Sequence, residues 1–202
     1  MKKDEIITLY NERLDKLGNI PSSAGWKDLE TQYLRFTELT DSLEINNISR
    51  ILDLGCGYGA LIDYFKTIKV KIKEENYCGI DFSKKMINAA KLRHPKAKFI
   101  YSDFFEANIE KYDYILCSGA LNIKTNNEDI YSNLEKFVAA FLPKADKALS
   151  FNLIHDNVDY KDKNLNYYNL EKVVKILTYY SRVFHIKNSY KLYETSVTVF
   201  KN

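Results

Sequence analysis

The sequence predicts an α/β fold: a doubly wound, mixed seven-stranded sheet with helices on both faces and a helical extension before it. From residue 50 onward, short apolar segments of strand length alternate with segments of helical periodicity. A glycine-rich turn follows the first of these strands. The last two strand-like segments, 181–188 and 191–202, leave no room for a helix between them. Because parallel neighbours need a long crossover, these two segments must pair as an antiparallel hairpin.

The first 45 residues predict two helices outside the sheet. Apolar side chains recur near helical spacing over residues 3–17 and again over residues 28–43. The loop between these helices contains Trp26, the single tryptophan of the chain. We therefore divide the chain into a helical lid over residues 1–45 and a core over residues 46–202.

Alternating strands and helices are expected to build the core. Strands are predicted at 50–55, 76–81, 97–102, 112–119 and 147–154, and helices at 60–68, 83–92, 128–142 and 170–180. Ser83 is suited to cap the start of one helix, and Pro143 stops another. A polar loop rich in Tyr and Asn spans residues 155–169. With the terminal hairpin, these elements make a sheet of seven strands.

Composition narrows the function classes. The chain has 202 residues, of which 46% are hydrophobic and 28% charged, as is typical of a globular domain. Its net charge of +3 is too small to indicate nucleic acid binding by itself. The three cysteines lie far apart, which favours reduced thiols over a disulfide framework or a zinc site. Without a signal-peptide pattern or an apolar run of roughly 18 residues, we expect a cytoplasmic protein with no membrane association and no metal.

The segment "RILDLGCGYGAL", residues 50–61, contains the strongest local motif. Gly55, Gly57 and Gly59 occupy every second position after an apolar strand, a pattern typical of a backbone cradle for a nucleotide or cofactor. Asp81 ends the next strand, where an acid binds ribose hydroxyls in dinucleotide-binding folds. These features alone leave a nicotinamide cofactor possible.

Two further features favour a different ligand. Asp53 stands two residues before the first glycine, so its carboxylate is expected beneath the loop. There it would repel a pyrophosphate and attract a cationic group such as an ammonium or a sulfonium. The terminal antiparallel hairpin is also foreign to the dinucleotide-binding sheet.

Residues 45–200 resemble the class I S-adenosylmethionine-dependent methyltransferases, which have a Rossmann-like fold. The segments "LDLGCGYG", "YCGIDFSKKMINAAK", "FIYSDFFE" and "YDYILCSGAL" are similar to four motifs of that family, in the family's order. The upstream segment "AGWKDLETQYLRFTEL" resembles one that precedes the core in a bacterial subgroup. The resemblance implies S-adenosylmethionine as cofactor and S-adenosylhomocysteine as product.

The resemblance also implies a cofactor site at the carboxyl ends of the strands. The residues expected to form it are Asp53, Gly55, Cys56, Gly57, Gly59, Asp81, Phe82, Ser102, Asp103, Phe104, Cys117, Ser118 and Arg35. In this assignment Asp81 binds the ribose and Asp103 the adenine amino group. Phe82 and Phe104 line the adenine ring, although aromatic residues at strand ends also serve as core. Cys117 is expected to be a packed residue rather than a nucleophile.

Substrate and catalytic residues are expected in the lid and the loops. The acceptor site is predicted to contain Trp26, Tyr58, His155 and Tyr168, and the proton acceptor to be His155 or Tyr10. Each has a structural alternative: Trp26 could anchor the lid, and His155 could be an exposed loop residue. Arg35 could bind an anion, or it could form a solvated surface pair with Gln32.

The function that these features favour is methylation of an oxygen or nitrogen atom in a small metabolite, by a monomer or homodimer. Arg35 and nearby lysines would suit an anionic or phosphorylated acceptor. An RNA or protein methyltransferase is the main alternative, and the absence of a D/N-P-P-[YF] motif after the fourth strand weighs against it. The sequence also allows a nicotinamide-dependent oxidoreductase or a non-catalytic partner protein that binds the cofactor only to fold.

Overall fold

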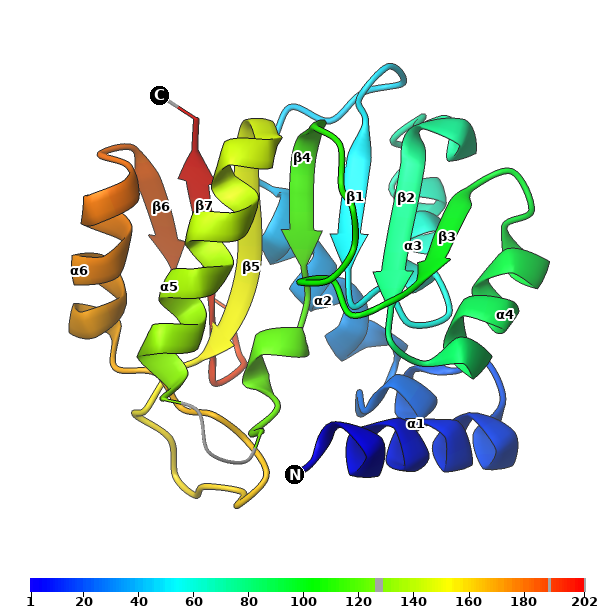
Figure 1. Ribbon diagram of the computed structural model, residues 1–202, viewed down its shortest axis with the longest axis horizontal. Coiled ribbons are helices and arrows are strands. Elements are labelled where there is room, and N and C mark those ends of the chain that lie inside the picture. Colours follow the sequence, from blue (N-terminus) through cyan, green and yellow to red (C-terminus); the bar gives the residue numbers. More distant parts are fainter. Residues whose placement is uncertain (126–128, 189, 202) are drawn as a thin grey trace.

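A seven-stranded mixed sheet forms the centre of the protein (Figure 1). The computed structural model describes residues 1–125, 129–188 and 190–201. The strands are β1 (Ile51–Leu54), β2 (Tyr77–Asp81), β3 (Lys98–Tyr101), β4 (Tyr112–Cys117), β5 (Ala145–Ile154), β6 (Phe184–Lys187) and β7 (Glu194–Phe200). Their order across the sheet is β3-β2-β1-β4-β5-β7-β6. Only β7 runs antiparallel to its neighbours, β5 and β6, which confirms the predicted hairpin.

Helices cover both faces of this sheet, as predicted. They are α1 (Lys3–Leu17), α2 (Leu29–Thr40), α3 (Ala60–Thr67), α4 (Lys84–Arg93), α5 (Ile130–Phe141) and α6 (Leu170–Tyr180). The apolar sides of α5 and α6 pack against one face of the sheet. Those of α2, α3 and α4 pack against the other. The chain therefore has two apolar cores, one on each side of the strands.

Capping residues explain where several helices begin. Asp28 accepts a hydrogen bond from the Thr31 amide and Ser83 accepts one from the Met86 amide, so α2 and α4 start directly after them. The helix predicted over 28–43 ends earlier, at Thr40. In the same way Asp129 caps α5; residue 128, where that helix was expected to begin, lies outside the described residues. The fifth strand begins two residues before its predicted start because Ala145 already pairs with β4.

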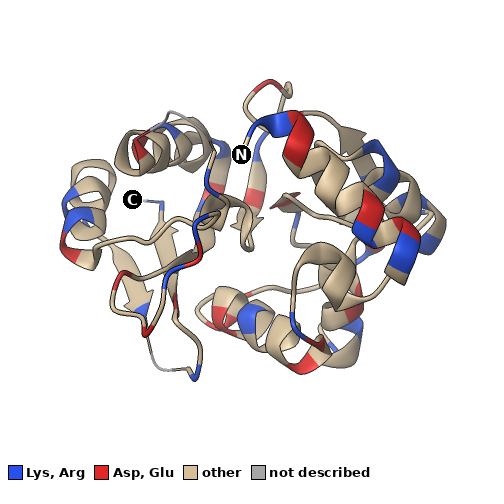
Figure 2. Cartoon of the chain, turned by 90° about the horizontal axis from the view of Figure 1, so that it is seen from below, with Lys and Arg blue, Asp and Glu red and all other residues tan. Residues whose placement is uncertain are grey.

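The carboxyl ends of the parallel strands meet at the lower edge of the sheet in Figure 1, and α1 lies beneath that edge. In the view onto it, acidic and basic residues alternate over the helices and do not form one basic face (Figure 2). In the described part of the chain, no helix has both the length and the apolar character needed to cross a bilayer. The glycine loop and the loops after β2, β3 and β4 come together at this edge, next to α1.

Candidate functional site

The glycine loop needs residues without a side chain. Gly55 and Gly59 have φ angles of 77° and 83°, in the left-handed region that favours glycine. A Cβ atom at Gly55 would lie 2.9 Å from the Cβ of Ala120, and one at Gly59 would lie 2.9 Å from Cδ2 of His94. The Gly55 amide donates to the carbonyl of Ile80 at 2.8 Å, which ties the loop to β2. Without side chains at these positions, the loop backbone can therefore pack closely on Ala120, His94 and β2.

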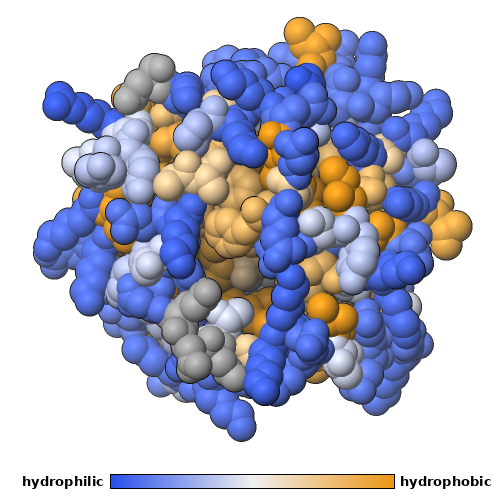
Figure 3. Space-filling view, viewed as in Figure 1, coloured by the Kyte–Doolittle hydropathy of each residue, from blue (hydrophilic) through white to orange (hydrophobic). Residues whose placement is uncertain are grey.

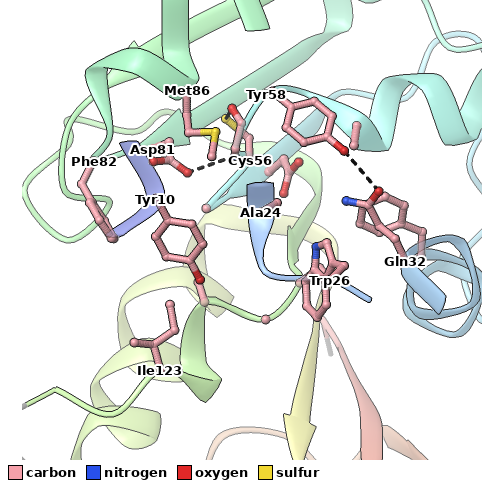
Figure 4. Close-up of a pocket in the computed structure, with 18 residues that line it drawn as sticks. Tyr10, Ala24, Trp26, Gln32, Cys56, Tyr58, Asp81, Phe82, Met86 and Ile123 are labelled. Atoms are coloured by element: carbon pink, nitrogen blue, oxygen red, sulfur yellow. Dashed lines mark hydrogen bonds between the residues drawn. The ribbon is translucent and has the colours of Figure 1, made fainter. Parts of the chain in front are cut away.

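A small cavity of about 100 Å³ lies against this loop, and we call it the loop cavity (Figure 4). Its walls come from α1, α2, the segment 24–26, the glycine loop and the residues after β2 and β4. The lining residues are Tyr10, Ala24, Trp26, Gln32, Phe36, Asp53, Gly55, Cys56, Gly57, Tyr58, Ala60, Asp81, Phe82, Met86, Ser118, Gly119, Ala120 and Ile123. Asp53 and Asp81 are the charged residues of this lining, and none of its described members is Lys or Arg.

Hydrogen-bond donors orient both carboxylates, of which Asp53 is buried and Asp81 is half-buried. Asp53 is 4% exposed and accepts a hydrogen bond of 2.5 Å from the Tyr77 hydroxyl. The Asp81 carboxylate accepts from the amides of Gly57 and Ser83, at 2.9 and 2.8 Å. Burial raises the pKa of Asp53 to about 7 and that of Asp81 to about 6. A cation bound in the loop cavity would stabilise the charged form of either group.

A second cavity of about 1090 Å³, which we call the apolar cavity, adjoins the first. It is lined by Met1, Lys2, Lys3, Ile6, Phe82, Asp103, Phe104, Phe105, Ala120, Leu121, Ile123, Thr125, Asn133, Lys136, Ala139, Ala140, Asn166 and Tyr168. Figure 3 shows apolar surface in a hollow near the middle of this face, bordered by hydrophilic side chains. Phe82, Ala120 and Ile123 line both cavities, so the two form one elongated site along the sheet edge.

Asp103 lies in the apolar cavity and is already paired. Its Oδ2 atom accepts from the Lys3 ammonium at 2.8 Å, and its Oδ1 atom accepts from the Phe105 amide. Phe104 packs edge-on against the rings of Phe137 and Phe141 in α5, with centroid separations of 6.2 and 5.7 Å. The loop after β3 is thereby tied both to α1 and to the core.

Comparison with known proteins shows a methyltransferase domain within the chain. Residues 51–144 match the family described as "Methyltransferase domain". A protein of Mycobacterium tuberculosis (strain ATCC 25618 / H37Rv), Rv1506c, which is named as a methyltransferase, is 29% identical over 177 residues, covering 83% of this chain and 99% of that protein. The crystal structure of magnesium protoporphyrin IX methyltransferase (ChlM) from Synechocystis PCC 6803 with bound SAM has the same fold, with a TM-score of 0.61 at 16% identity; the match covers 86% of this chain and 79% of that one.

Residues 51–144 thus form a methyltransferase domain, and the chain has the Rossmann-like fold of the class I S-adenosylmethionine-dependent methyltransferases. Protein 235L of Invertebrate iridescent virus 6, also named as a methyltransferase, is 32% identical over 91 residues. That match covers 45% of this chain and 33% of the viral protein. The chain therefore spans about a third of the length of this relative.

The structure brings most of the predicted cofactor residues to the two cavities. The loop cavity receives Asp53, Gly55, Cys56, Gly57, Asp81, Phe82 and Ser118, and the apolar cavity receives Asp103 and Phe104. Four predicted residues line neither: Gly59, Ser102, Cys117 and Arg35. Gly59 stands at the start of α3, and the Ser102 hydroxyl donates to the Asp103 carbonyl. Cys117 is fully buried in the core on the α5 side, where burial raises the pKa of its thiol.

Arg35 has a partner that the sequence did not indicate. Its Nε and Nη2 atoms both contact Oε1 of Glu194 at 2.6 Å, and its guanidinium carbon lies 4.4 Å from the centre of the Trp26 ring. The expected alternative, a solvated pair with Gln32, is wrong because Gln32 is 2% exposed and lines the loop cavity. Trp26 packs on Gly119, as an anchor of the lid would, and it also lines the loop cavity, where its contact with a substrate stays a prediction.

His155 lies apart from both cavities. It is 7% exposed, so the alternative of an exposed loop histidine is wrong. Its ring packs edge-on against Tyr193, and its backbone bridges to Tyr168. Tyr168 lines the apolar cavity and donates its hydroxyl proton to the Leu121 carbonyl at 2.8 Å. Tyr168 therefore lines the apolar cavity, whereas His155 lines neither cavity.

Two other tyrosines face the loop cavity directly. Tyr10 reaches it from α1, and Tyr58 donates to Oε1 of Gln32 at 3.4 Å (Figure 4). Burial raises the pKa of both phenols above the ordinary value. At neutral pH both phenols therefore keep their protons and can donate hydrogen bonds. A protonated Tyr10 is poorly suited to act as a base.

Sequence reasoning missed Tyr77, Gln32 and Glu194. Tyr77 opens β2 and reaches Asp53 of β1 only because of the register of these parallel strands. Glu194 reaches Arg35 across 159 positions of sequence. No local motif in the sequence marks such long-range partners. The register of β1 and β2 would have been needed to place Tyr77 beside Asp53. In the described residues no group of three or more His, Cys, Asp or Glu side chains is placed to hold a metal ion.

Proposed function

We propose that the protein transfers the methyl group of S-adenosylmethionine to an oxygen or nitrogen atom of a small molecule and releases S-adenosylhomocysteine. The observation that carries this proposal is the loop cavity, where the buried carboxylate of Asp53 and the half-buried one of Asp81 face a lining with no described Lys or Arg. Such a cavity suits a ligand with ammonium and sulfonium groups, since each cation would relieve the cost of the buried charges. A pyrophosphate would be repelled there, which disfavours a nicotinamide cofactor.

The residues present fit this cofactor. Asp53 would hold the amino group, Asp81 the two ribose hydroxyls, and Asp103 the adenine amino group, with Phe82 and Phe104 beside the ring. These residues span the loop cavity and the apolar cavity in that order, as an elongated ligand requires. A carboxylate accepts two neighbouring hydroxyls well because it presents a pair of acceptor oxygens.

The chain's own part in the reaction is alignment and exclusion of water. The cofactor supplies a methyl group that its sulfonium already activates. With that group bound, the acceptor atom would take the methyl carbon as the carbon–sulfur bond breaks, sulfur would keep the electron pair, and the proton of the acceptor would pass to solvent. Tyr10, Trp26 and Gln32 close the loop cavity over the reacting groups. Orientation of this kind can lower a barrier by ~7–11 kcal/mol.

A small-molecule acceptor is favoured over RNA or protein. Charges of both signs alternate around the sheet edge (Figure 2), whereas a nucleic acid would need a continuous basic surface. The Synechocystis neighbour is named for a small-molecule substrate, magnesium protoporphyrin IX. Arg35, which the sequence offered as an anion ligand, is occupied by Glu194. We also retain as proposals the lid role of residues 1–45, a monomer or homodimer, and a cytoplasmic location.

Calorimetry and a product assay test the proposal together. We expect the protein to bind S-adenosylmethionine and S-adenosylhomocysteine and not to bind NAD, because of the carboxylates in the loop cavity. With a panel of hydroxyl- and amine-bearing metabolites, we expect release of S-adenosylhomocysteine with at least one acceptor. Binding of NAD in place of the methyl donor would overturn the proposal. Donor binding without product release from any acceptor, including RNA and protein, would indicate a non-catalytic partner.

A further inference from the structure

Three buried side-chain oxygens, one of them on the wall of the loop cavity, have no hydrogen-bond partner among the described residues: Ser118 Oγ, Asn152 Oδ1 and Glu194 Oε2. Asn152 and Glu194 are 0% and 4% exposed. An unsatisfied buried polar group costs about 1–3 kcal/mol, so native proteins seldom retain several in one place without a use for them. A ligand that donates hydrogen bonds would remove this cost.

The three oxygens come from neighbouring strands at the same edge of the sheet. Cys117 of β4 pairs with Phe151 of β5, so the next residues, Ser118 and Asn152, come opposite each other. Glu194 begins β7 on the other side of β5, and Asn152 lies two residues before its cross-strand partner. Such diagonal neighbours are about 7–8 Å apart. The oxygens therefore form a row from the wall of the loop cavity across β5 to β7, which we call the acceptor row.

Trp26 and Arg35 cover this row. Trp26 lies so close to Gly119, the residue after Ser118, that a Cβ atom there would be 2.5 Å from its ring. The Arg35 guanidinium packs on the same indole and pairs with Oε1 of Glu194. In Figure 4, Trp26 stands at the end of the cavity toward β5 and β7. Ser118 thus lines the loop cavity, whereas Asn152 and Glu194 line neither cavity, and a ligand would reach them past Trp26 and Arg35.

The negative charge of Glu194 in the acceptor row is balanced by the guanidinium of Arg35. Oε1 of Glu194 takes both contacts from Arg35, and Oε2 is left without a donor. Asn152 uses its amide nitrogen to donate to Ser196 Oγ at 2.7 Å, which leaves its carbonyl oxygen. Two of the three atoms can only accept hydrogen bonds. A carboxylate or phosphate placed there would face oxygens, with the nearby guanidinium already engaged.

We propose that the acceptor row binds the methyl acceptor through hydrogen bonds that the acceptor donates, so that its reacting end is a hydroxyl or an amine and not a carboxylate or phosphate. This inference rests on the proposed methyltransferase function and identifies the class of acceptor. It replaces the anionic acceptor that Arg35 suggested in the sequence. The same row places that hydroxyl or amine at Ser118, next to the loop cavity where the methyl group would lie.

Four probes on one aromatic scaffold test it: benzyl alcohol, benzylamine, benzoate and phenyl phosphate. Their binding to the protein saturated with S-adenosylhomocysteine would be measured by saturation-transfer NMR and by Trp26 fluorescence. We expect the alcohol and the amine to bind more tightly than the two anions. Equal or tighter binding of benzoate or phenyl phosphate, or no binding of the alcohol and amine, would overturn the inference.

Variants separate the row from general effects on folding. Asn152→Leu and Ser118→Ala should each weaken alcohol and amine binding about three- to tenfold, the loss of one hydrogen bond. Ser150→Ala is the matched control, because Ser150 shares the face of β5 with Asn152 but its hydroxyl has protein partners, including the Leu39 carbonyl at 2.7 Å. Wild-type probe affinity in both Asn152→Leu and Ser118→Ala would refute the role of the row. Failure of the wild type to bind S-adenosylhomocysteine would instead refute the proposed function.

Discussion

Asp81 shows at the scale of a single residue how the site is built before a ligand arrives. Its two oxygens already accept the amides of Gly57 and Ser83, which fixes the carboxylate and orients it into the loop cavity. Burial raises its pKa, so the folded protein retains this carboxylate at a cost. A group that is costly, fixed and directed into a cavity is suited to binding rather than to stability.

Asp81→Asn should therefore weaken the binding of S-adenosylhomocysteine by about ten- to a hundredfold, the range for one hydrogen bond to a charged group. Asp113→Asn is the control, because the Asp113 carboxylate also accepts a backbone amide, that of Arg50, but at the other end of the strands. Isothermal titration calorimetry measures both affinities. Equal affinity in Asp81→Asn and wild type would show that Asp81 does not hold the ribose.

The same scale shows what the sequence could predict of the site. Asp53 and Asp81 were predicted because each lies within a short motif at the end of a strand. Asn152, Glu194 and Tyr77 were not, because their importance depends on which strands become neighbours. The role of Arg35 changed for the same reason, since its partner lies on β7.

At the scale of elements, α1 is attached to the rest of the protein by exposed polar contacts and by a few apolar side chains, including Tyr10 and Leu14. Lys3 pairs with Asp103, Asn11 accepts from the Ser83 hydroxyl, and Asp15 pairs with Lys85. Of its residues only Ile6 is buried. Exposed ion pairs contribute about 0–1 kcal/mol each, so α1 should open more easily than the helices that carry the cores.

Hydrogen exchange should detect this difference. Amides of α1 should exchange faster than those of α5, and S-adenosylhomocysteine should slow α1 specifically, because Tyr10 and Ile6 line the two cavities. Lys3→Gln should speed exchange in α1 while changing the free energy of unfolding by less than about 1 kcal/mol. Mass spectrometry resolves the peptides. Equal protection of α1 and α5, unaffected by the ligand, would contradict a lid role for α1.

The contact between Gly119 and Trp26 joins the turn after β4 to the loop before α2. Gly119→Ala combines a positive φ of 80° with a Cβ atom 2.5 Å from the indole. Gly18→Ala is the matched control, since Gly18 has a φ of 73° and nothing within 4 Å of its Cβ position. We expect Gly119→Ala to lose about 1–3 kcal/mol more than Gly18→Ala, from overpacking.

Urea unfolding compares the two variants, and the emission of Trp26, the single tryptophan, reports the indole directly. In Gly119→Ala the emission should shift to longer wavelength as the indole moves toward water. Equal stability losses with unchanged emission would mean that Trp26 does not pack on this turn.

Across the whole molecule, the directions of the strands in the sheet were predictable, because the length of each connection limits how the strands it joins can pair. A short connection between the last two strands permits only an antiparallel pair, and helical crossovers permit only parallel pairs. Helix boundaries followed where a capping residue marked them, as at Ser83. The acceptor row was not predictable, because the polar residues of β5 and β7 have meaning only once these strands are paired under α2.

The free energy of unfolding should depend on pH in a direction that the carboxylates of Asp53 and Asp81 set. In the unfolded chain an Asp has a pKa of about 3.9, whereas Asp53 and Asp81 have pKa values of about 7 and about 6 in the folded protein. At pH values between the unfolded pKa and the folded pKa of each group, the folded state binds more protons than the unfolded state. The stability that each raised pKa contributes is therefore fully present below pH ~4. It is lost as the pH rises through the folded pKa, by up to ~1.4 kcal/mol of unfolding free energy per pH unit.

Without ligand, the melting temperature should thus fall as the pH rises from 5 to 7, and Asp53→Asn should flatten the upper part of this slope. Asp63 and Glu74, whose pKa values neighbouring cations lower against the effect of burial, act in the opposite direction but only at more acidic pH. Saturating S-adenosylhomocysteine should weaken the slope, because its ammonium group stabilises the charged form of Asp53. Thermal melts over this pH range, with and without the ligand, measure all three effects. An unchanged slope in Asp53→Asn would mean that another group carries the proton, and the cation-binding role of Asp53 would lose its physical basis.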